Sequence, residues 1–242
     1  MFETPTSPND LYRHRLLQEV AACSPNRILE VGVGEGKFLR DAASLGAELV
    51  GVEPDAPSVE RVRSKGYAVH LASAEELPFA DASVDVTVFS YTAHHIADWP
   101  SALAEAMRVT RKAIIVLDPW HDERIPSQAV AAGFERWCRS IDRANGEVHH
   151  DNLGANELLG ELTRDMGAWA VRLEYLLELV ELGSTHLEEV AQKQLTKAKN
   201  PKLWQPLLNQ LIHQAKHRGY SADGAILVRL MKRRSPVLLF NS

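Results

Sequence analysis

Cysteine is scarce in this 242-residue chain, which carries Cys23 and Cys138 and no others. The two residues lie far apart and no Cys-x-x-Cys pair occurs, so a disulfide scaffold is excluded. A structural zinc or iron–sulfur centre of the usual spacing is not expected either. We therefore expect a chain from a reducing compartment that folds around a core of its own, without covalent cross-links.

The chain also lacks a long apolar run and an excess of basic residues. No stretch of about 18 apolar residues occurs, so we expect no membrane span. The first residues show neither the basic start nor the apolar core of a secretory signal, which makes the cytoplasm the expected location. Lys plus Arg number 27 against 32 Asp plus Glu, a net charge of −5. This balance argues against nucleic acid and favours a small-molecule partner, whereas the oligomeric state is unknown.

Apolar runs alternate with helical patterns in the first half of the chain. Strands are predicted near residues 27–31, 48–52, 67–71, 84–90 and 112–117. Their near-continuous apolar character is typical of a parallel sheet that helices cover on both faces. The second half is mostly helical by pattern. Helices are predicted over residues 129–141, 156–166 and 206–217 and from Thr185 onward, with strands starting near 169 and spanning 225–231.

A glycine-rich segment follows the first predicted strand and opens a helix: Glu30-Val31-Gly32-Val33-Gly34-Glu35-Gly36. Glycines at alternate positions tolerate positive φ and let the backbone approach a ligand closely. Ligands of open α/β sheets bind outside the carboxyl ends of the strands, where this segment lies. The spacing does not fit a dinucleotide fingerprint, because Lys37 stands where a third glycine is needed. It does not fit a P-loop either, because Phe38 follows Gly36-Lys37.

Polar residues also follow the next three strands. Glu53 ends the second strand, and a carboxylate there can accept hydrogen bonds from both hydroxyls of a ribose. The loop over residues 73–79 can meet the edge of an adenine. Ser90 and Tyr91 end the fourth strand beside the same crevice.

In order and spacing, these segments resemble the class I S-adenosylmethionine-dependent methyltransferases, in their broad small-molecule subgroup. The resemblance rests on residues 28–36, 51–54, 74–79 and 84–96, and it covers residues 10–120 well and the remainder loosely. It implies an α/β fold with a Rossmann-like, doubly wound, seven-stranded, mostly parallel sheet, a last antiparallel strand and helical lid insertions. Many relatives have Pro-Gly-Gly before the fifth strand. Here Thr110-Arg111-Lys112 stands in that place, and we expect a tighter turn.

The resemblance also implies S-adenosyl-L-methionine as cofactor and S-adenosyl-L-homocysteine as product. The carboxylate of the glycine loop would hold the amino-acid end of the cofactor, the second carboxylate the ribose, and the third loop the adenine. The implied cofactor-binding residues are Glu30, Gly32, Val33, Gly34, Gly36, Glu53, Pro54, Ala74, Glu75 and Ser90. We expect one domain over residues 1–242, with a cofactor-binding core (1–120), a mainly helical acceptor or lid region (121–220), and a final strand and tail (221–242).

Catalysis in this family is mainly the positioning of an O, N, C or S nucleophile of a small molecule in line with an activated methyl group. A base is needed only where that nucleophile must lose a proton, and its pKa should lie near neutral. The candidates for such a role or for a substrate contact are His95, His94, His121 and Tyr91. His149-His150-Asp151 is interpreted as a polar loop without metal, because adjacent histidines point apart and no third ligand is near in sequence.

Three questions stay open from the sequence. The distal apolar stripes indicate helix packing first, and a lid over an apolar acceptor is the sharper hypothesis. A protein that binds the cofactor without methyl transfer, or that uses the sulfonium for cyclisation or carboxymethyl transfer, is the alternative function. A nicotinamide-dependent oxidoreductase on the same sheet order is disfavoured by the glycine spacing.

Overall fold

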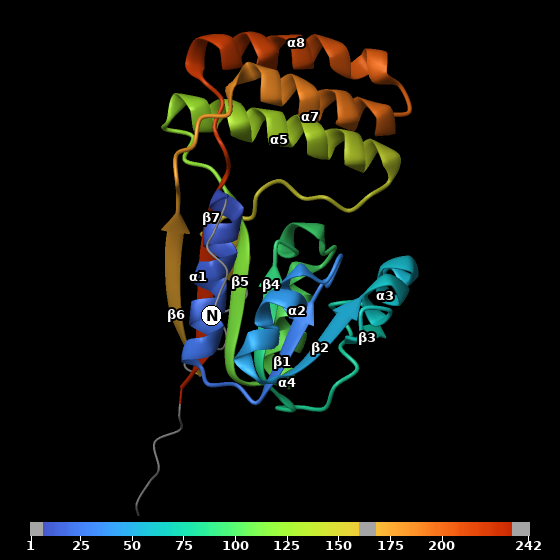
Figure 1. Ribbon diagram of the computed structural model, residues 1–242, viewed down its shortest axis with the longest axis vertical. Helices are drawn as coiled ribbons and strands as arrows, with labels where there is room; N and C mark the ends of the chain where they lie inside the picture. Colours follow the sequence, from blue (N-terminus) through green and yellow to red (C-terminus); the bar gives the residue numbers. More distant parts are fainter. Residues whose placement is uncertain (1–6, 160–167, 234–242) are drawn as a thin grey trace, which may run out of the picture.

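The computed structural model describes residues 7–159 and 168–233, and its strands lie side by side in one sheet (Figure 1). Within these residues seven strands are hydrogen-bonded in the order β3-β2-β1-β4-β5-β7-β6. They are β1 (Arg27–Val31), β2 (Glu48–Glu53), β3 (Ala68–Leu71), β4 (Val84–Ser90), β5 (Thr110–Trp120), β6 (Trp169–Leu176) and β7 (Gly224–Lys232). Only β7 runs against its neighbours, so the predicted mostly parallel sheet with an antiparallel last strand is confirmed.

Helices cover both faces of the sheet, because neighbouring strand residues point to opposite sides. On one face, α1 (Pro8–Ala22) and α2 (Lys37–Ala42) pack on alternate residues of the central strands. The helix α3 (Ala56–Arg63) packs beside α2 through valines. On the other face, α4 (Trp99–Val109) and the short α6 (Ala155–Leu159) bury the remaining strand residues. This is the doubly wound arrangement that the apolar strands predicted.

Three further helices form a layer beyond the carboxyl ends of the parallel strands, at the top of Figure 1. They are α5 (Pro126–Asn145), α7 (Gly183–Lys197) and α8 (Pro201–Arg218). Their apolar stripes pack on one another as a separate core around Phe134, Trp137, Leu187 and Leu211. We call these three helices the helical layer. Because β6 lies between α5 and α7 in the chain, two separate segments build the layer, each anchored in the sheet.

Several predicted boundaries are wrong, each for a local reason. Thr110-Arg111-Lys112 forms no turn: α4 ends at Val109 and β5 begins at once, with the Thr110 hydroxyl 2.6 Å from that of Thr87. The helix expected from Thr185 begins at Gly183 without a side-chain cap. The helix expected from Pro206 begins at Pro201, so Pro206 lies inside it. Of the helix expected over residues 156–166, only the part up to residue 159 lies within the described residues.

No helix in the described ranges combines the length and the apolar character that a membrane crossing requires. Cys23 and Cys138 are both free thiols, in agreement with the expectation of no disulfide between them.

Candidate functional site

Two adjoining cavities lie at the carboxyl ends of β1, β2 and β4. The larger has a volume of about 480 Å³ and the smaller about 350 Å³. Gly32, Gly34, Tyr91 and Thr92 line both, so the two cavities meet at the glycine loop and at the end of β4. Strands of a parallel sheet end at one edge, which is why loops far apart in sequence share this site.

The glycine loop adopts a backbone that only glycine takes easily. Gly32 and Gly34 have φ angles of 76° and 52°. A Cβ atom at Gly32 would lie 2.1 Å from the Thr92 methyl carbon, whereas a Cβ atom at Gly34 would meet nothing within 4 Å. Gly36 caps α2 with a φ of 76° and lines neither cavity. Gly32 therefore closes the loop against β4, and Gly34 leaves space beside it.

Glu30 of β1 lines the smaller cavity and is buried, with 2% of its surface exposed. Desolvation raises the pKa of this carboxyl well above its usual range, and a hydrogen bond from the Leu39 backbone opposes the shift. The Oε2 atom has no hydrogen-bond partner among the described residues. A buried acceptor without a partner is costly, so this oxygen is suited to receive a donor from a ligand.

Glu53 ends β2 on the wall of the larger cavity. Its Oε2 accepts a hydrogen bond from the Gly34 amide at 2.9 Å, and its Oε1 accepts one from the Asp55 amide at 3.1 Å. Each carboxylate oxygen can accept a second hydrogen bond. The backbone amides therefore fix the orientation of the carboxylate and leave it able to bind two hydroxyl groups.

The next loop completes the larger cavity. Pro54, Ala74 and Glu75 line it, as does Ile96 from the segment after β4. Glu75 Oε1 accepts a hydrogen bond from the Asp98 amide at 3.3 Å, which ties the loop to the start of α4. The wall thus combines apolar surface with a carboxylate, which suits a flat base bearing an amino group.

Residues that follow β4 stand between the two cavities. Ser90 lines the smaller one, and Tyr91 has a φ of 55°, a conformation that costs free energy in a residue with a side chain. The Thr92 hydroxyl donates to the Gly32 carbonyl at 3.2 Å. Sequence reasoning missed Thr92. Its position two residues past the strand, opposite a glycine, is the signal that could have found it.

The first helix contributes a face that sequence reasoning did not single out. Asn9 and Arg13, one helical turn apart, line the smaller cavity together with Lys37. Tyr12 is buried beneath the helix, and its hydroxyl accepts from the Glu178 amide at 2.7 Å. Two basic side chains therefore stand across the smaller cavity from the buried Glu30.

The histidine candidates separate in space. His95 lines the larger cavity, and burial together with the neighbouring His94 lowers its pKa. His94 is buried behind it, with Nδ1 2.8 Å from Asp118 Oδ1, and lines neither cavity. His149, from the segment after α5, packs against both rings at centroid distances of 5.3 and 4.3 Å. Burial, with His95 as the next cause, lowers the pKa of His149 to about 4.

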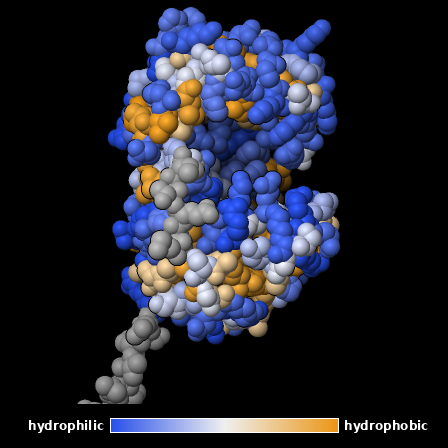
Figure 2. Space-filling view, viewed as in Figure 1, coloured by the Kyte–Doolittle hydropathy of each residue, from blue (hydrophilic) through white to orange (hydrophobic). Residues whose placement is uncertain are grey.

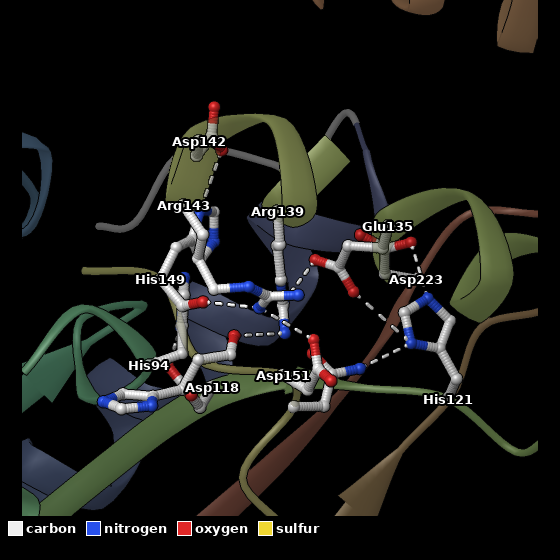
Figure 3. A network of polar contacts seen from close by, with 12 residues as sticks. His94, Asp118, His121, Glu135, Arg139, Asp142, Arg143, His149, Asp151 and Asp223 are labelled. Carbon is white, nitrogen blue, oxygen red and sulfur yellow. Dashed lines mark hydrogen bonds and ion pairs between the residues drawn. The ribbon is translucent and has the colours of Figure 1, made fainter. Parts of the chain in front are cut away.

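His121 belongs to a polar network beneath the helical layer (Figure 3). Its Nε2 lies 3.0 Å from Asp223 Oδ1, and its Nδ1 lies 2.7 Å from the Asn152 side-chain nitrogen. Arg139, fully buried, donates to Glu135 Oε1 at 2.6 Å and to the His150 carbonyl at 3.0 Å. The network joins α5 to the loop that starts β7, and His121 lines neither cavity.

The structure thus brings nine of the ten implied cofactor residues onto the walls of the two cavities, and Gly36 alone lies outside. Of the four catalytic candidates, Tyr91 and His95 are on a wall and His94 and His121 are not. The binding and catalytic roles themselves are taken up as proposals below.

Part of the chain that forms the site is similar to known methyltransferases. Residues 29–116 match the family model described as a methyltransferase domain. A relative from Mycobacteroides abscessus named "Uncharacterized methyltransferase" is 33% identical over 169 residues, 63% of each chain. A probable S-adenosylmethionine-dependent methyltransferase of Mycobacterium tuberculosis is 34% identical over 103 residues, which cover 41% of this chain and 38% of that protein.

The match spans only part of these curated relatives. An uncharacterized methyltransferase of Mycolicibacterium gilvum is 42% identical over 89 residues, 35% of this chain and 34% of that relative. The segment that matches the family model, residues 29–116, carries the glycine loop and Glu53. The regions beyond it therefore give no direct guide to the acceptor.

Solved structures extend the likeness to nearly the whole fold. The YcgJ protein of Bacillus subtilis has a TM-score of 0.66 at 18% identity, covering 93% of this chain and 99% of that one. A putative methyltransferase of Bacillus halodurans also has a TM-score of 0.66, at 17% identity, covering 91% and 98%. Residues 29–116 are thus similar to methyltransferase domains, and the fold as a whole is similar to that of these solved structures.

Proposed function

We propose that this protein transfers the methyl group of S-adenosylmethionine to a small polar acceptor. The observation that carries the proposal is the pair of carboxylates in the two adjoining cavities, Glu30 with an unpartnered buried oxygen and Glu53 fixed by backbone amides. A ligand that spans both cavities has to present a hydrogen-bond donor at one end and hydroxyl groups toward the other. The cofactor of this family has both.

The smaller cavity fits the amino-acid end of the cofactor. Glu30 would accept from the ammonium group, while Arg13 and Lys37 would attract the carboxylate. Arg13 Nε is buried without a hydrogen-bond partner, although Asp41 lies 3.7 Å from it as an ion-pair partner. A buried carboxyl group and two basic side chains around one cavity suit a zwitterion better than a simple cation or anion.

The larger cavity fits the adenosine. Glu53 would bind the ribose hydroxyls, and Ala74 and Glu75 would contact the adenine, with Pro54 and Ile96 as apolar surface. Val33 of the glycine loop and Ser90 at the end of β4 lie on the smaller cavity, beside the methionine end. Every one of these contacts comes from a loop that follows a strand.

The cofactor supplies a methyl group already activated on a sulfonium, so the protein's task is positioning and exclusion of water. Gly32 and Tyr91 stand where the two cavities join, which is where the sulfonium would lie. We propose that Tyr91 orients the acceptor there and that His95 is the histidine nearest to it. His94 and His121 act as positioning residues, since Asp118 holds the first and Asn152 and Asp223 occupy both ring nitrogens of the second.

The helical layer favours a polar acceptor over the apolar one that sequence reasoning considered. Its apolar stripes are used in its own core, around Trp137 and Leu211. Between the layer and the sheet, Figure 2 shows a hollow whose surface is hydrophilic. Facing the sheet from α5, the polar network contributes Glu135 and Arg139. We therefore propose that residues 121–220 of a single domain select a polar small molecule.

Two measurements test this function. Calorimetry should show binding of S-adenosylmethionine and S-adenosylhomocysteine in preference to NADH. Incubation with cofactor and a panel of polar small molecules should release S-adenosylhomocysteine and give a product heavier by one CH₂. Preferential binding of NADH would contradict the assignment of S-adenosylmethionine as the cofactor. Tight cofactor binding with a chemically changed substrate but no S-adenosylhomocysteine would support the cyclase-type alternative instead.

A further inference from the structure

Three histidines from two distant parts of the chain converge beside the larger cavity. His94 and His95 belong to the short 3-10 turn after β4 (Ala93–His95), and His149 belongs to the segment that follows α5. One ring nitrogen of each lies within 4.8 Å of one ring nitrogen of each of the others. The ring centroids are 4.2 to 5.3 Å apart. Ring nitrogens that lie this close together can bind one ion in common.

The outer nitrogen of each ring is already held by an acceptor. Nδ1 of His94 lies 2.8 Å from Asp118 Oδ1, and Nδ1 of His149 lies 2.8 Å from Asp142 Oδ2. Nδ1 of His95 lies 3.3 Å from the Val148 carbonyl, which can only accept. In each ring the proton therefore resides on Nδ1, and Nε2 carries the lone pair.

The two carboxylates are themselves built into the protein. Asp118 of β5 is fully buried. Asp142 of α5 is buried and accepts a hydrogen bond from the Gln194 side chain at 2.6 Å through its other oxygen. Carboxylates and carbonyls that fix the far nitrogen of each histidine are the usual outer shell of an imidazole-bound metal, where they set the tautomer and raise ligand basicity.

A second cluster in the molecule shows the contrast. His121, Glu135 and Asp223 also bring ligand atoms within 4.8 Å of one another. There both ring nitrogens of the histidine are engaged, by Asn152 and by Asp223, so no lone pair is left for an ion. That cluster is a hydrogen-bond network, whereas in the three-histidine cluster no hydrogen bond from a described residue reaches Nε2 of any of the three rings.

We propose that His94, His95 and His149 bind one divalent transition metal ion of the zinc or cobalt type through three imidazole nitrogens. Three neutral imidazoles leave a fourth coordination position for water or for an oxygen or nitrogen of a substrate. His95 and Val148 line the larger cavity, so the ion would lie at its wall. The ion would also link the turn after β4 to the segment after α5. It would thereby link residues 1–120, which we call the cofactor half, to the helical layer. Metal binding here does not depend on the proposed methyl transfer.

Sequence analysis favoured a polar loop at His149-His150-Asp151 because no third ligand lies nearby in the sequence. The fold supplies the missing ligands from His94 and His95, more than fifty positions upstream. His150 points elsewhere, with Nε2 3.0 Å from the Ile96 carbonyl, as expected for adjacent histidines. The metal proposal therefore replaces that interpretation for His149 alone.

The test is a titration of untagged, metal-free protein with Co²⁺, followed by its visible absorption, and competition with Zn²⁺. The exposed pair His213 and His217, one helical turn apart on α8 with rings 4.4 Å apart, could chelate an ion by itself. The experiment therefore uses the His213→Gln/His217→Gln protein as its reference. One equivalent of Co²⁺ should bind with the intense absorption of four-coordinate geometry.

Variants then locate the site. His149→Ala and His95→Ala should each weaken Co²⁺ binding at least 100-fold, and Asp142→Asn should weaken it about 10- to 100-fold through the lost outer-shell contact. His70→Gln, an exposed histidine elsewhere, is the matched control and should change nothing. Full-strength binding by folded His149→Ala protein, or no binding by the reference protein, overturns the proposal. Calorimetry with S-adenosylmethionine on the same proteins reports the cofactor site separately, so failure of one proposal is distinguishable from failure of the other.

Discussion

The cofactor half and the helical layer both bury ionisable side chains, and they do so in opposite ways. Glu30 lies inside the first with one oxygen unpartnered, and it forms no ion pair with a residue in the described ranges. Arg139 lies inside the second and donates to Glu135 and to a backbone carbonyl, although its Nε and the Glu135 Oε2 have no hydrogen-bond partner in the described ranges. A buried carboxylate left without a partner destabilises the fold and is kept for a ligand. A matched pair holds elements together.

The comparison separates two kinds of residue at this interface. Groups in the cofactor half are positioned to bind a ligand, so their replacement should change ligand binding more than folding. Groups in the helical layer already have partners within the chain, so their replacement should change folding first. The predictions below set variants of the two regions against each other.

The largest expected loss of stability comes from a substitution in the glycine loop. Gly32→Val combines a φ of 76° with a Cβ atom 2.1 Å from the Thr92 methyl carbon, and we expect a loss of about 4–6 kcal/mol of stability. Gly34→Val meets no atom of the protein and should cost only about 1–3 kcal/mol of backbone strain while removing measurable cofactor binding. Urea denaturation and calorimetry on both variants check this. Normal S-adenosylmethionine affinity of the folded Gly34→Val protein would contradict the assignment of the space beside Gly34 to the cofactor.

Arg139→Met tests the helical layer. Glu135, which is half-buried, would lose its partner, and the expected loss is about 3–5 kcal/mol, measured by urea denaturation. The double variant Arg139→Met/Glu135→Leu should recover much of it, because no lone charge remains. Cofactor affinity should be unchanged in the folded protein. A large drop in that affinity, with stability intact, would mean that Arg139 acts at the cofactor site and that the contrast between the regions is wrong.

Sequence alone predicts the cofactor half better than the helical layer, and the reason is physical. Glu30 and Glu53 lie at the carboxyl ends of β1 and β2, and Glu75 lies in the loop after β3. Parallel strands share one edge, so the order of these residues along the chain already places them together. The short pattern around each strand also predicted the parallel sheet, whereas the antiparallel last strand was implied by the resemblance to the methyltransferase family. What it did not give was the start of β5 at Thr110, which depends on a hydroxyl contact with Thr87 across the sheet.

The site residues that the sequence did not reveal reach their places only through the packing of one element on another. Asn9 and Arg13 reach the smaller cavity only because α1 packs with Tyr12 toward the sheet. His149 meets His94 only because the segment after α5 returns to the sheet, with the His150 amide donating to the His94 carbonyl at 2.8 Å. No local periodicity encodes either contact.

Glu53→Ala should show the intermediate effect in the cofactor half. Loss of hydrogen bonds from two hydroxyls to a charged acceptor should weaken S-adenosylmethionine binding by about 1.5–3 kcal/mol, roughly 10- to 150-fold in Kd. Glu48→Gln, at the exposed other end of β2 and paired with Arg27 at 3.1 Å, is the control and should leave Kd unchanged. Calorimetry gives both values. An unaltered Kd for Glu53→Ala would exclude the ribose role.

The smallest effect, and the sharpest test of the contrast, is the pH dependence that Glu30 imposes. Burial raises the pKa of Glu30 well above 4.5, so the folded protein keeps this proton at pH values where the unfolded chain has released it. The folded state then binds more protons, and stability falls as pH rises from about 4.5 until Glu30 ionises. Glu30→Gln has no such proton, so its stability relative to the native protein should rise by up to about 1.4 kcal/mol per pH unit in that window.

Urea denaturation at pH 5, 6, 7 and 8 measures this difference, with the exposed Glu60→Gln as a control that should run parallel to the native protein. The affinity of Glu30→Gln for the cofactor should fall while its stability rises. The Gln variant gains stability yet binds S-adenosylmethionine more weakly, because its amide oxygen accepts from the ammonium group without the negative charge of a carboxylate. A variant that gained stability and kept full affinity would show that the buried carboxyl is not kept for the ligand. Parallel stability profiles for Glu30→Gln and the native protein would show that it ionises as freely in the fold as in water.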